Sequence, residues 1–179
     1  MTIRAAMVSA VVVLGCGWPL QASATEITPN NVYRVVDAIH ADLALFHDAS
    51  SLTPAVTEAQ HSLTPRRPRH VLQKAREVMV KVQLLRKING LPDTEMPLMP
   101  ARDIRPSDVL RLVERIHEDL AELRPIFGVG GSPDTIAKPS GKTPSDVYHS
   151  LYHVSAQLDG LGIPRVVPND VYRVALTVS

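Results

Sequence analysis

Two histidines and a methionine occupy equivalent places in successive segments of the sequence. His40, Met79 and His117 each lie eleven residues after a proline. Imidazole and thioether groups ligate copper and haem iron, and helical bundles hold such groups on facing helices. One hypothesis is therefore a copper or non-covalent haem site built from these three side chains. The alternative is that each histidine lies at the edge of the core and pairs with a carboxylate such as Asp42 or Asp119.

Three arginines crowd the start of the second predicted helix. Arg66, Arg67 and Arg69 flank Pro68, where the helix dipole disfavours cations. An anion bound there would relieve the conflict, so these arginines form a candidate anion site. Two alternatives need no ligand. Either the arginines are simply solvated, or the basic second unit faces an acidic first unit on a neighbouring helix.

A further histidine pair and the absence of catalytic motifs complete the chemical inventory. His149 and His153 are four residues apart and share a helix face, which favours a surface pair over a metal site. The sequence contains no G-x-S-x-G, H-E-x-x-H or glycine-rich phosphate loop. We therefore predict a protein that is not an enzyme.

The elements that position these residues are predicted by a repeated motif, in which a proline is followed three residues later by valine. Successive prolines of the first four copies are 39, 38 and 38 residues apart, and a fifth copy follows after 24. Proline suits the first position of a helix, and a preceding threonine can cap it. The copies begin at Pro29, Pro68, Pro106, Pro144 and Pro168.

The residues after each of the first four prolines follow a heptad pattern. Offsets +3, +7, +10, +14 and +17 from each proline are apolar in all four units. Alternating spacings of four and three are typical of helices that pack at shallow angles in a bundle. We therefore predict an all-α fold, an antiparallel up-and-down four-helix bundle of ~38-residue repeats over residues 25–163. Connections of roughly 15 to 18 residues, unusually long for a compact bundle, would join the helices.

The N-terminus has the layout of a secretory signal peptide over residues 1–24. Arg4 precedes a short apolar run, and Ala22-Ser23-Ala24 is a small-x-small cleavage site. The expected location is the periplasm or the outside of the cell. An alternative cleavage box ends at Cys16 and would leave a lipoprotein anchored through that residue. Cleavage after Ala24 would remove the only cysteine.

The C-terminal residues 164–179 start a fifth unit and stop halfway through a helix of the usual length. Either they form a short fifth helix that caps the bundle, or the chain is a fragment of a longer repeat protein. The cap hypothesis requires Val171, Val174 and Val178 to contact the bundle, because an isolated helix of about eleven residues is marginal in water.

Composition narrows the partners that we expect. The formal net charge is +1, which argues against nucleic acid, and no second apolar run approaches 18 residues, so no membrane span is expected after cleavage. The leading hypothesis is a non-enzymatic binding or interaction module of the cell envelope, in a ligand-sensing or scaffolding role, without a cofactor and with an unidentified protein or small ligand as its partner. The alternative is the copper or haem carrier described above.

Overall fold

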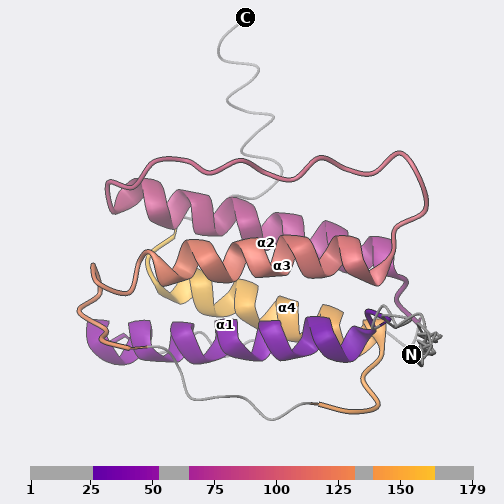
Figure 1. The fold of residues 1–179 in the computed structure, drawn as a ribbon. Helices are drawn as coiled ribbons and strands as arrows, with labels where there is room; N and C mark the ends of the chain where they lie inside the picture. Colours follow the sequence, from indigo (N-terminus) through magenta and orange to yellow (C-terminus); the bar gives the residue numbers. More distant parts are fainter. Residues whose placement is uncertain (1–25, 53–64, 132–138, 164–179) are drawn as a thin grey trace, which may run out of the picture.

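Four helices make up the regular structure of the described part of the chain. The structure is a computed structural model and describes residues 26–52, 65–131 and 139–163. The helices are α1 (Pro29–Ser50), α2 (Pro68–Ile88), α3 (Pro106–Ala121) and α4 (Pro144–Gly160). They pack against one another as a four-helix bundle (Figure 1). The all-α class and the bundle are therefore confirmed.

Each helix begins at the proline that the sequence motif marks. In every first turn, the side chain two residues after the proline accepts a hydrogen bond from the backbone N–H of the residue before the proline. This N–H would otherwise lack a partner inside the helix. The four bonds are Thr28 to Asn31 (3.0 Å), Arg67 to His70 (3.1 Å), Arg105 to Asp108 (2.8 Å) and Thr143 to Asp146 (2.7 Å). The starts at Arg67 and Arg105, which lack a capping hydroxyl, are stabilised in this way.

The heptad seam forms the core, which confirms the predicted helix phase. Nineteen of its twenty side chains are buried, and the twentieth, Leu161, is half-buried against the others. Phe46 adds a stacked contact with Phe127 from the segment that follows α3, with 4.5 Å between the ring centroids. The long apolar stripe is thus the surface along which the four helices meet.

The order of the helices around the bundle differs from the order in the chain. α1 contacts α3 and α4, and α2 also contacts α3 and α4. Among the described residues, α1 does not pack against α2, and α3 does not pack against α4. The helices of each consecutive pair therefore lie diagonally opposite each other. An up-and-down bundle would place consecutive helices side by side.

All four helices run in the same direction, so the predicted antiparallel arrangement is wrong. One shallow apolar pocket is lined by the first-turn residues of every helix, Pro29, Val32, Pro68, Val71, Pro106, Val109, Pro144 and Val147. Four helix N-termini can line one pocket only if they lie at the same end of the bundle. Figure 1 shows the same arrangement, with each helix starting at the right-hand end.

The long connections make the parallel arrangement possible. Residues 89–105 join α2 to α3, and 17 extended residues can span about 55 Å. The 21 residues of α2 rise only about 31 Å along the bundle, so the connection can return to the starting end. Figure 1 shows it running back along the whole bundle. The connection length that is unusual for a bundle is therefore what parallel helices require.

Contacts between neighbouring helices show a common register. Side chains at offset +18 reach the residue at offset +13 on the next helix: Arg124 contacts Asp42, Arg86 contacts Asp119, and His47 contacts the backbone of Gln157. Five residues correspond to about 7.5 Å of rise, which a long side chain covers between parallel helices in register. In an antiparallel pair, offsets +18 and +13 would lie far apart.

Two predicted segments lie outside the described residues. They are the signal peptide over 1–24 and the fifth helix with Val171, Val174 and Val178.

A distance measurement between spin labels tests the direction of the helices. In a background with Cys16 replaced, cysteines at Arg67 and Arg105 carry labels at the starts of α2 and α3. Parallel helices place these backbones about one helix spacing apart, roughly 10 Å, whereas antiparallel helices separate them by about 25–30 Å. The control pair is Arg67 with Glu122, at the end of α3, for which the long distance is expected. A long distance for the first pair and a short one for the control would refute the parallel bundle.

Candidate functional site

The three residues of the predicted metal site lie in separate surroundings. Met79 is fully buried in the core. His40 lies between α1 and α4, where its Nδ1 is 2.6 Å from Oε1 of Gln157 and its Nε2 is 3.0 Å from Oγ of Ser150. An amide oxygen only accepts hydrogen bonds, so Nδ1 donates to Gln157 and Nε2 is left to accept from the hydroxyl of Ser150.

The second histidine of that set lies at a different interface. His117 of α3 is 3.3 Å from the carboxylate of Asp42 on α1, which matches the alternative in which a histidine at the core edge pairs with a carboxylate. His40 does not follow that alternative, because its partners are an amide and a hydroxyl. Within the described ranges, no group of three or more His, Cys, Asp or Glu side chains has a geometry that would hold a metal ion. Copper or haem binding stays a prediction.

A polar groove runs between α1 and α4 and is lined by His40 and two further histidines. His40, His149 and His153 line it with Asp37 and Asp146, and Tyr33, Lys142 and Ser150 complete the lining. Burial lowers the pKa of His40 against the opposing effect of the hydrogen bond to Gln157. Burial also raises the pKa of Asp37, although His40 and Lys142 act in the other direction. His149 and His153, the pair that shares a helix face, both lie at this groove.

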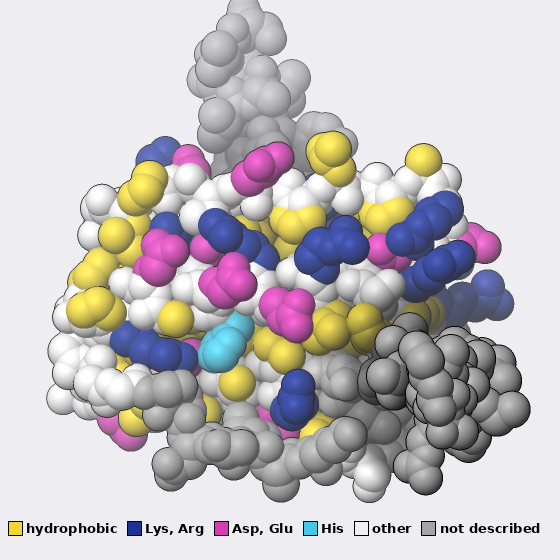
Figure 2. Space-filling view, in the orientation of Figure 1, with side chains coloured by type: hydrophobic (Ala, Val, Ile, Leu, Met, Phe, Trp, Pro, Cys, Tyr) yellow, Lys and Arg dark blue, Asp and Glu magenta, His cyan; other side chains and the backbone are white. Residues whose placement is uncertain are grey.

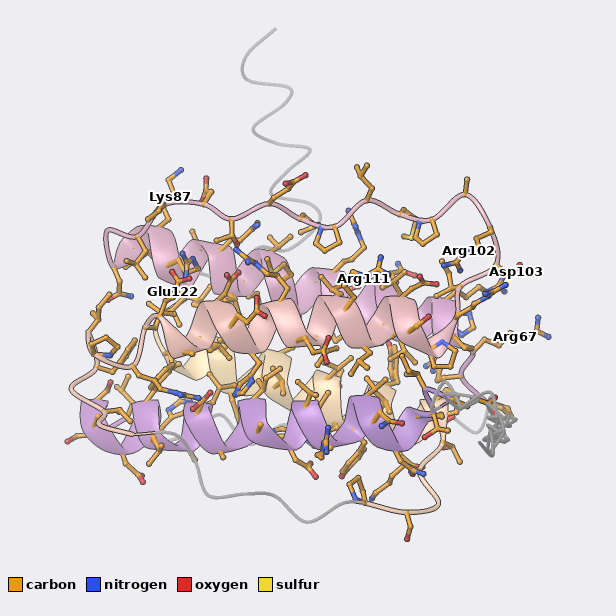
Figure 3. The ribbon with its side chains drawn as sticks, in the orientation of Figure 1. Arg67, Lys87, Arg102, Asp103, Arg111 and Glu122 are labelled. Atoms are coloured by element: carbon orange, nitrogen blue, oxygen red, sulfur yellow. The ribbon has the colours of Figure 1, made fainter. Side chains whose placement is uncertain are left out.

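The candidate anion site lies where the four helix N-termini meet. We call this region the basic end and define it as residues 26–33, 65–72, 102–110 and 141–148. Its exposed charged side chains are four arginines, Arg67, Arg69, Arg102 and Arg105, against the acids Glu26 and Asp103. In Figure 2, Lys and Arg side chains gather at this end, and Figure 3 labels Arg67 and Arg102 there. The three predicted arginines are thus part of a larger basic surface.

Two cations of the basic end are held in place by tyrosine rings of neighbouring helices. The guanidinium of Arg66 lies 4.4 Å from the ring centroid of Tyr148, and its backbone N–H donates to Oγ of Ser145 over 3.0 Å. The Nζ of Lys142 lies 4.0 Å from the ring centroid of Tyr33. Such cation–π contacts fix a charge without neutralising it. Both cations therefore have defined positions at the basic end.

The acids of the basic end are largely engaged in local structure. Asp108 accepts two hydrogen bonds of 2.8 Å from Arg102, and these bonds, against a smaller effect of burial, lower the pKa of its carboxyl. Asp146 caps α4 through Thr143, and its pKa is lowered for that reason. Asp108 therefore offsets the charge of Arg102, and the exposed Arg67, Arg69 and Arg105 carry the remaining positive charge.

The opposite end of the bundle has the opposite charge. We call it the acidic end and define it as residues 47–52, 85–93, 118–127 and 157–163. Among its described residues, the exposed acids are Asp48, Asp93, Glu118 and Glu122, against the exposed cation Lys87. Each helix end adds roughly half a charge, positive at the N-terminus and negative at the C-terminus. Because the helices are parallel, these partial charges add and strengthen the same polarity.

The sequence interpretation missed half of the basic end. It identified Arg66, Arg67 and Arg69 but not Arg102, Arg105 and Lys142, which precede α3 and α4. The available signal was that each of these residues lies within four positions before the proline that starts the next helix. That signal has meaning only when the four helix starts share one end.

The helix arrangement also bears on the two alternatives in which the arginines need no ligand. α1 and α2 are not neighbours, so the acidic first unit does not face the basic second unit. The cations of α2 instead reach the other two helices, as Lys81 pairs with Asp159 of α4 and Arg86 with Asp119 of α3. Solvated arginines remain an alternative for Arg67 and Arg69.

None of the described helices combines the length and the apolar character needed to cross a membrane.

Comparison of the chain with protein-family models, with curated proteins and with solved structures found no match.

Proposed function

We propose that the protein is a non-enzymatic interaction module of the cell envelope, and that its basic end binds a negatively charged protein partner. The observation that carries this proposal is the gathering of four helix N-termini at one end, among Arg66, Arg67, Arg69, Arg102 and Arg105. The signal-peptide pattern supports the envelope location.

The electrostatics of the basic end favour an anionic partner. Cations near a helix N-terminus are unfavourable by roughly 0.3–1 kcal/mol each at low ionic strength. Here the partial charges of four N-termini and several arginines share one surface, so an approaching carboxylate is attracted by both. A partner that carries several acidic groups would offset the repulsion between these arginines and the positive helix N-termini.

The arrangement also limits the entropy lost on binding. The ring of Tyr148 holds the guanidinium of Arg66, and the backbone around it is fixed by the first turns of α2 and α4. A charge that is already positioned loses less rotamer freedom when it binds. Arg67 and Arg69 beside it are exposed and can be reached by the partner.

Binding of poly-L-glutamate, a model of an acidic protein surface, tests this function. We expect saturable binding in about 20–50 mM salt that weakens strongly by 0.5 M, because the Debye length falls from about 15–20 Å to about 4 Å. Arg67→Gln should weaken binding about two- to fivefold, and Arg67→Gln with Arg69→Gln about tenfold.

Lys87→Gln is the matched control, since it removes one exposed cation from the other end of the same helix. It should leave the affinity unchanged. Equal loss of affinity in Arg67→Gln and Lys87→Gln would mean that binding follows overall charge rather than the basic end. Absence of any salt-sensitive binding would contradict the proposed function.

A further inference from the structure

The two ends of the bundle carry complementary surfaces. The basic end presents exposed arginines around a shallow apolar pocket of four prolines and four valines. The acidic end presents four exposed carboxylates, of which Glu122 pairs with Arg86 and Glu118 with Arg115. It also presents three exposed aliphatic side chains, Leu52, Ile88 and Ile126, which are 44%, 58% and 46% exposed. In Figure 3, Arg67 and Arg102 lie at one end with Asp103, and Glu122 lies at the other with Lys87.

We propose that copies of this chain associate head to tail, with the basic end of one bundle seated on the acidic end of the next. The proposal rests on the proposed function, because it identifies the anionic partner of the basic end as a second copy. The charges of the two ends are opposite in sign, and the helix dipoles add to this attraction because N-termini of one copy would face C-termini of the other.

The apolar groups of the two ends also match. Aliphatic side chains exposed at one end can cover the apolar pocket at the other, which removes both from water. The three protruding residues come from the ends of three helices: Leu52 follows α1, Ile88 ends α2 and Ile126 follows α3. They therefore surround the bundle axis, as the prolines and valines do at the opposite end.

The geometry of this contact predicts open growth. The two surfaces are different parts of the same chain, so the contact is heterologous, and each added copy leaves one basic and one acidic end free. Such a contact gives linear chains unless rotation closes a ring. Two copies in a closed, symmetric dimer would instead use one surface twice.

The small area of the ends predicts weak association that depends on charge. Four helices of about 10 Å diameter give an end face of about 400 Å² on each partner. Stable complexes bury about 800 Å² on each partner. Association should therefore require high protein concentration and low salt.

Sedimentation analysis of the full chain tests the proposal. In about 20–50 mM salt we expect the weight-average mass to rise continuously with concentration, and to fall to that of the monomer near 0.5 M. A monomer at low salt up to about 1 mM, or a dimer that does not grow, would overturn the proposal.

Charge reversal identifies the surfaces. One variant carries Arg67→Glu and Arg69→Glu at the basic end. The other carries Asp48→Lys and Asp93→Lys at the acidic end, where both residues are exposed. Each variant alone should associate at least about tenfold more weakly than the unmodified chain, because like charges then face each other. A mixture of the two should regain association, since each supplies the end that the other lacks. Unchanged association of either variant alone would overturn the proposal, as would a mixture that stays monomeric.

Poly-L-glutamate binding separates this inference from the function on which it rests. The variant with Asp48→Lys and Asp93→Lys keeps its basic end and should bind the polymer as the unmodified chain does. Polymer binding without self-association would overturn the inference and leave the proposed function in place. Self-association that survives loss of polymer binding in the Arg67→Glu and Arg69→Glu variant would overturn the inference alone, because the loss of polymer binding is what the proposed function predicts.

Discussion

Replacing Arg124 with methionine is expected to destabilise the protein by about 3–5 kcal/mol. Arg124 donates two hydrogen bonds of 2.8 Å to the carboxylate of Asp42, which is fully buried between α1 and α3. Removing the guanidinium takes both hydrogen bonds from the buried carboxylate and leaves the imidazole of His117, 3.3 Å away, beside it. Urea unfolding of the two proteins at neutral pH gives the difference in the free energy of unfolding.

Two further variants distinguish the ion pair from a general effect of losing an arginine. Arg111→Met removes an exposed arginine from the same helix and should change the free energy of unfolding by less than about 0.5 kcal/mol. The double variant Asp42→Leu with Arg124→Met removes both charges and should cost less than Arg124→Met alone, because no unpaired buried charge remains. A double variant that is less stable than the single one would contradict this account.

The effect of Arg124→Met should also depend on pH. Burial by itself raises the pKa of Asp42, but hydrogen bonds from His117 and Arg124 outweigh it, so the pKa is lowered. In the unfolded chain an aspartate titrates near about 3.9. The ion pair therefore contributes fully above that pH and is lost as the pH falls through the lower pKa of the folded state. We expect the stability difference between the two proteins to be largest near pH 7 and to shrink toward about pH 4 and below. A difference that is independent of pH would exclude the carboxylate as its cause.

The sequence was sufficient to predict the helices and the core because both depend on local spacing. A proline with an acceptor two residues later defines a helix start on its own, as Pro144 and Asp146 do. The seam positions follow from the helical period, which does not depend on neighbours. Leu43 and Leu120, both at offset +14, are therefore buried as predicted.

The direction of the helices did not follow from the same pattern. A heptad seam has the same spacing whether the neighbouring helix runs parallel or antiparallel, so it does not predict the direction of the helices. The usual short connections favour antiparallel neighbours, and the prediction followed that rule. The length of the segment from residue 51 to 67 was the available signal, since a chain that only turned around would not need 17 residues.

Contacts between helices depend on the direction and the order of the helices, so they could not be predicted from the sequence. His40 bonds to Ser150 and Gln157, which lie more than 100 residues away in the chain. These partners meet His40 only because α4 lies beside α1 in parallel register. The basic end is the same kind of feature, because Arg67 and Arg105 share a surface only when their helices start together.

Leu120→Ala, at a seam position near the C-terminal end of α3, is the second substitution with a large expected effect. Leu120 is fully buried, and truncating a leucine in such a position costs about 2–5 kcal/mol through lost burial and the cavity that remains. The spread reflects how far the neighbouring side chains can relax, and a tightly packed interior allows little relaxation. Urea unfolding compares the variant with the unmodified protein.

Glu118→Ala on the same helix is the matched control. Glu118 lies two residues from Leu120, its side chain is 65% exposed, and its contact with Arg115 is 3.4 Å long. An exposed ion pair of this kind contributes little, so the free energy of unfolding should change by less than about 0.5 kcal/mol. The two variants therefore separate the face of α3 that carries the fold from the face that meets water. Equal losses of stability would place Leu120 outside the core and would mean that the helix phase, and the bundle built on it, is wrong.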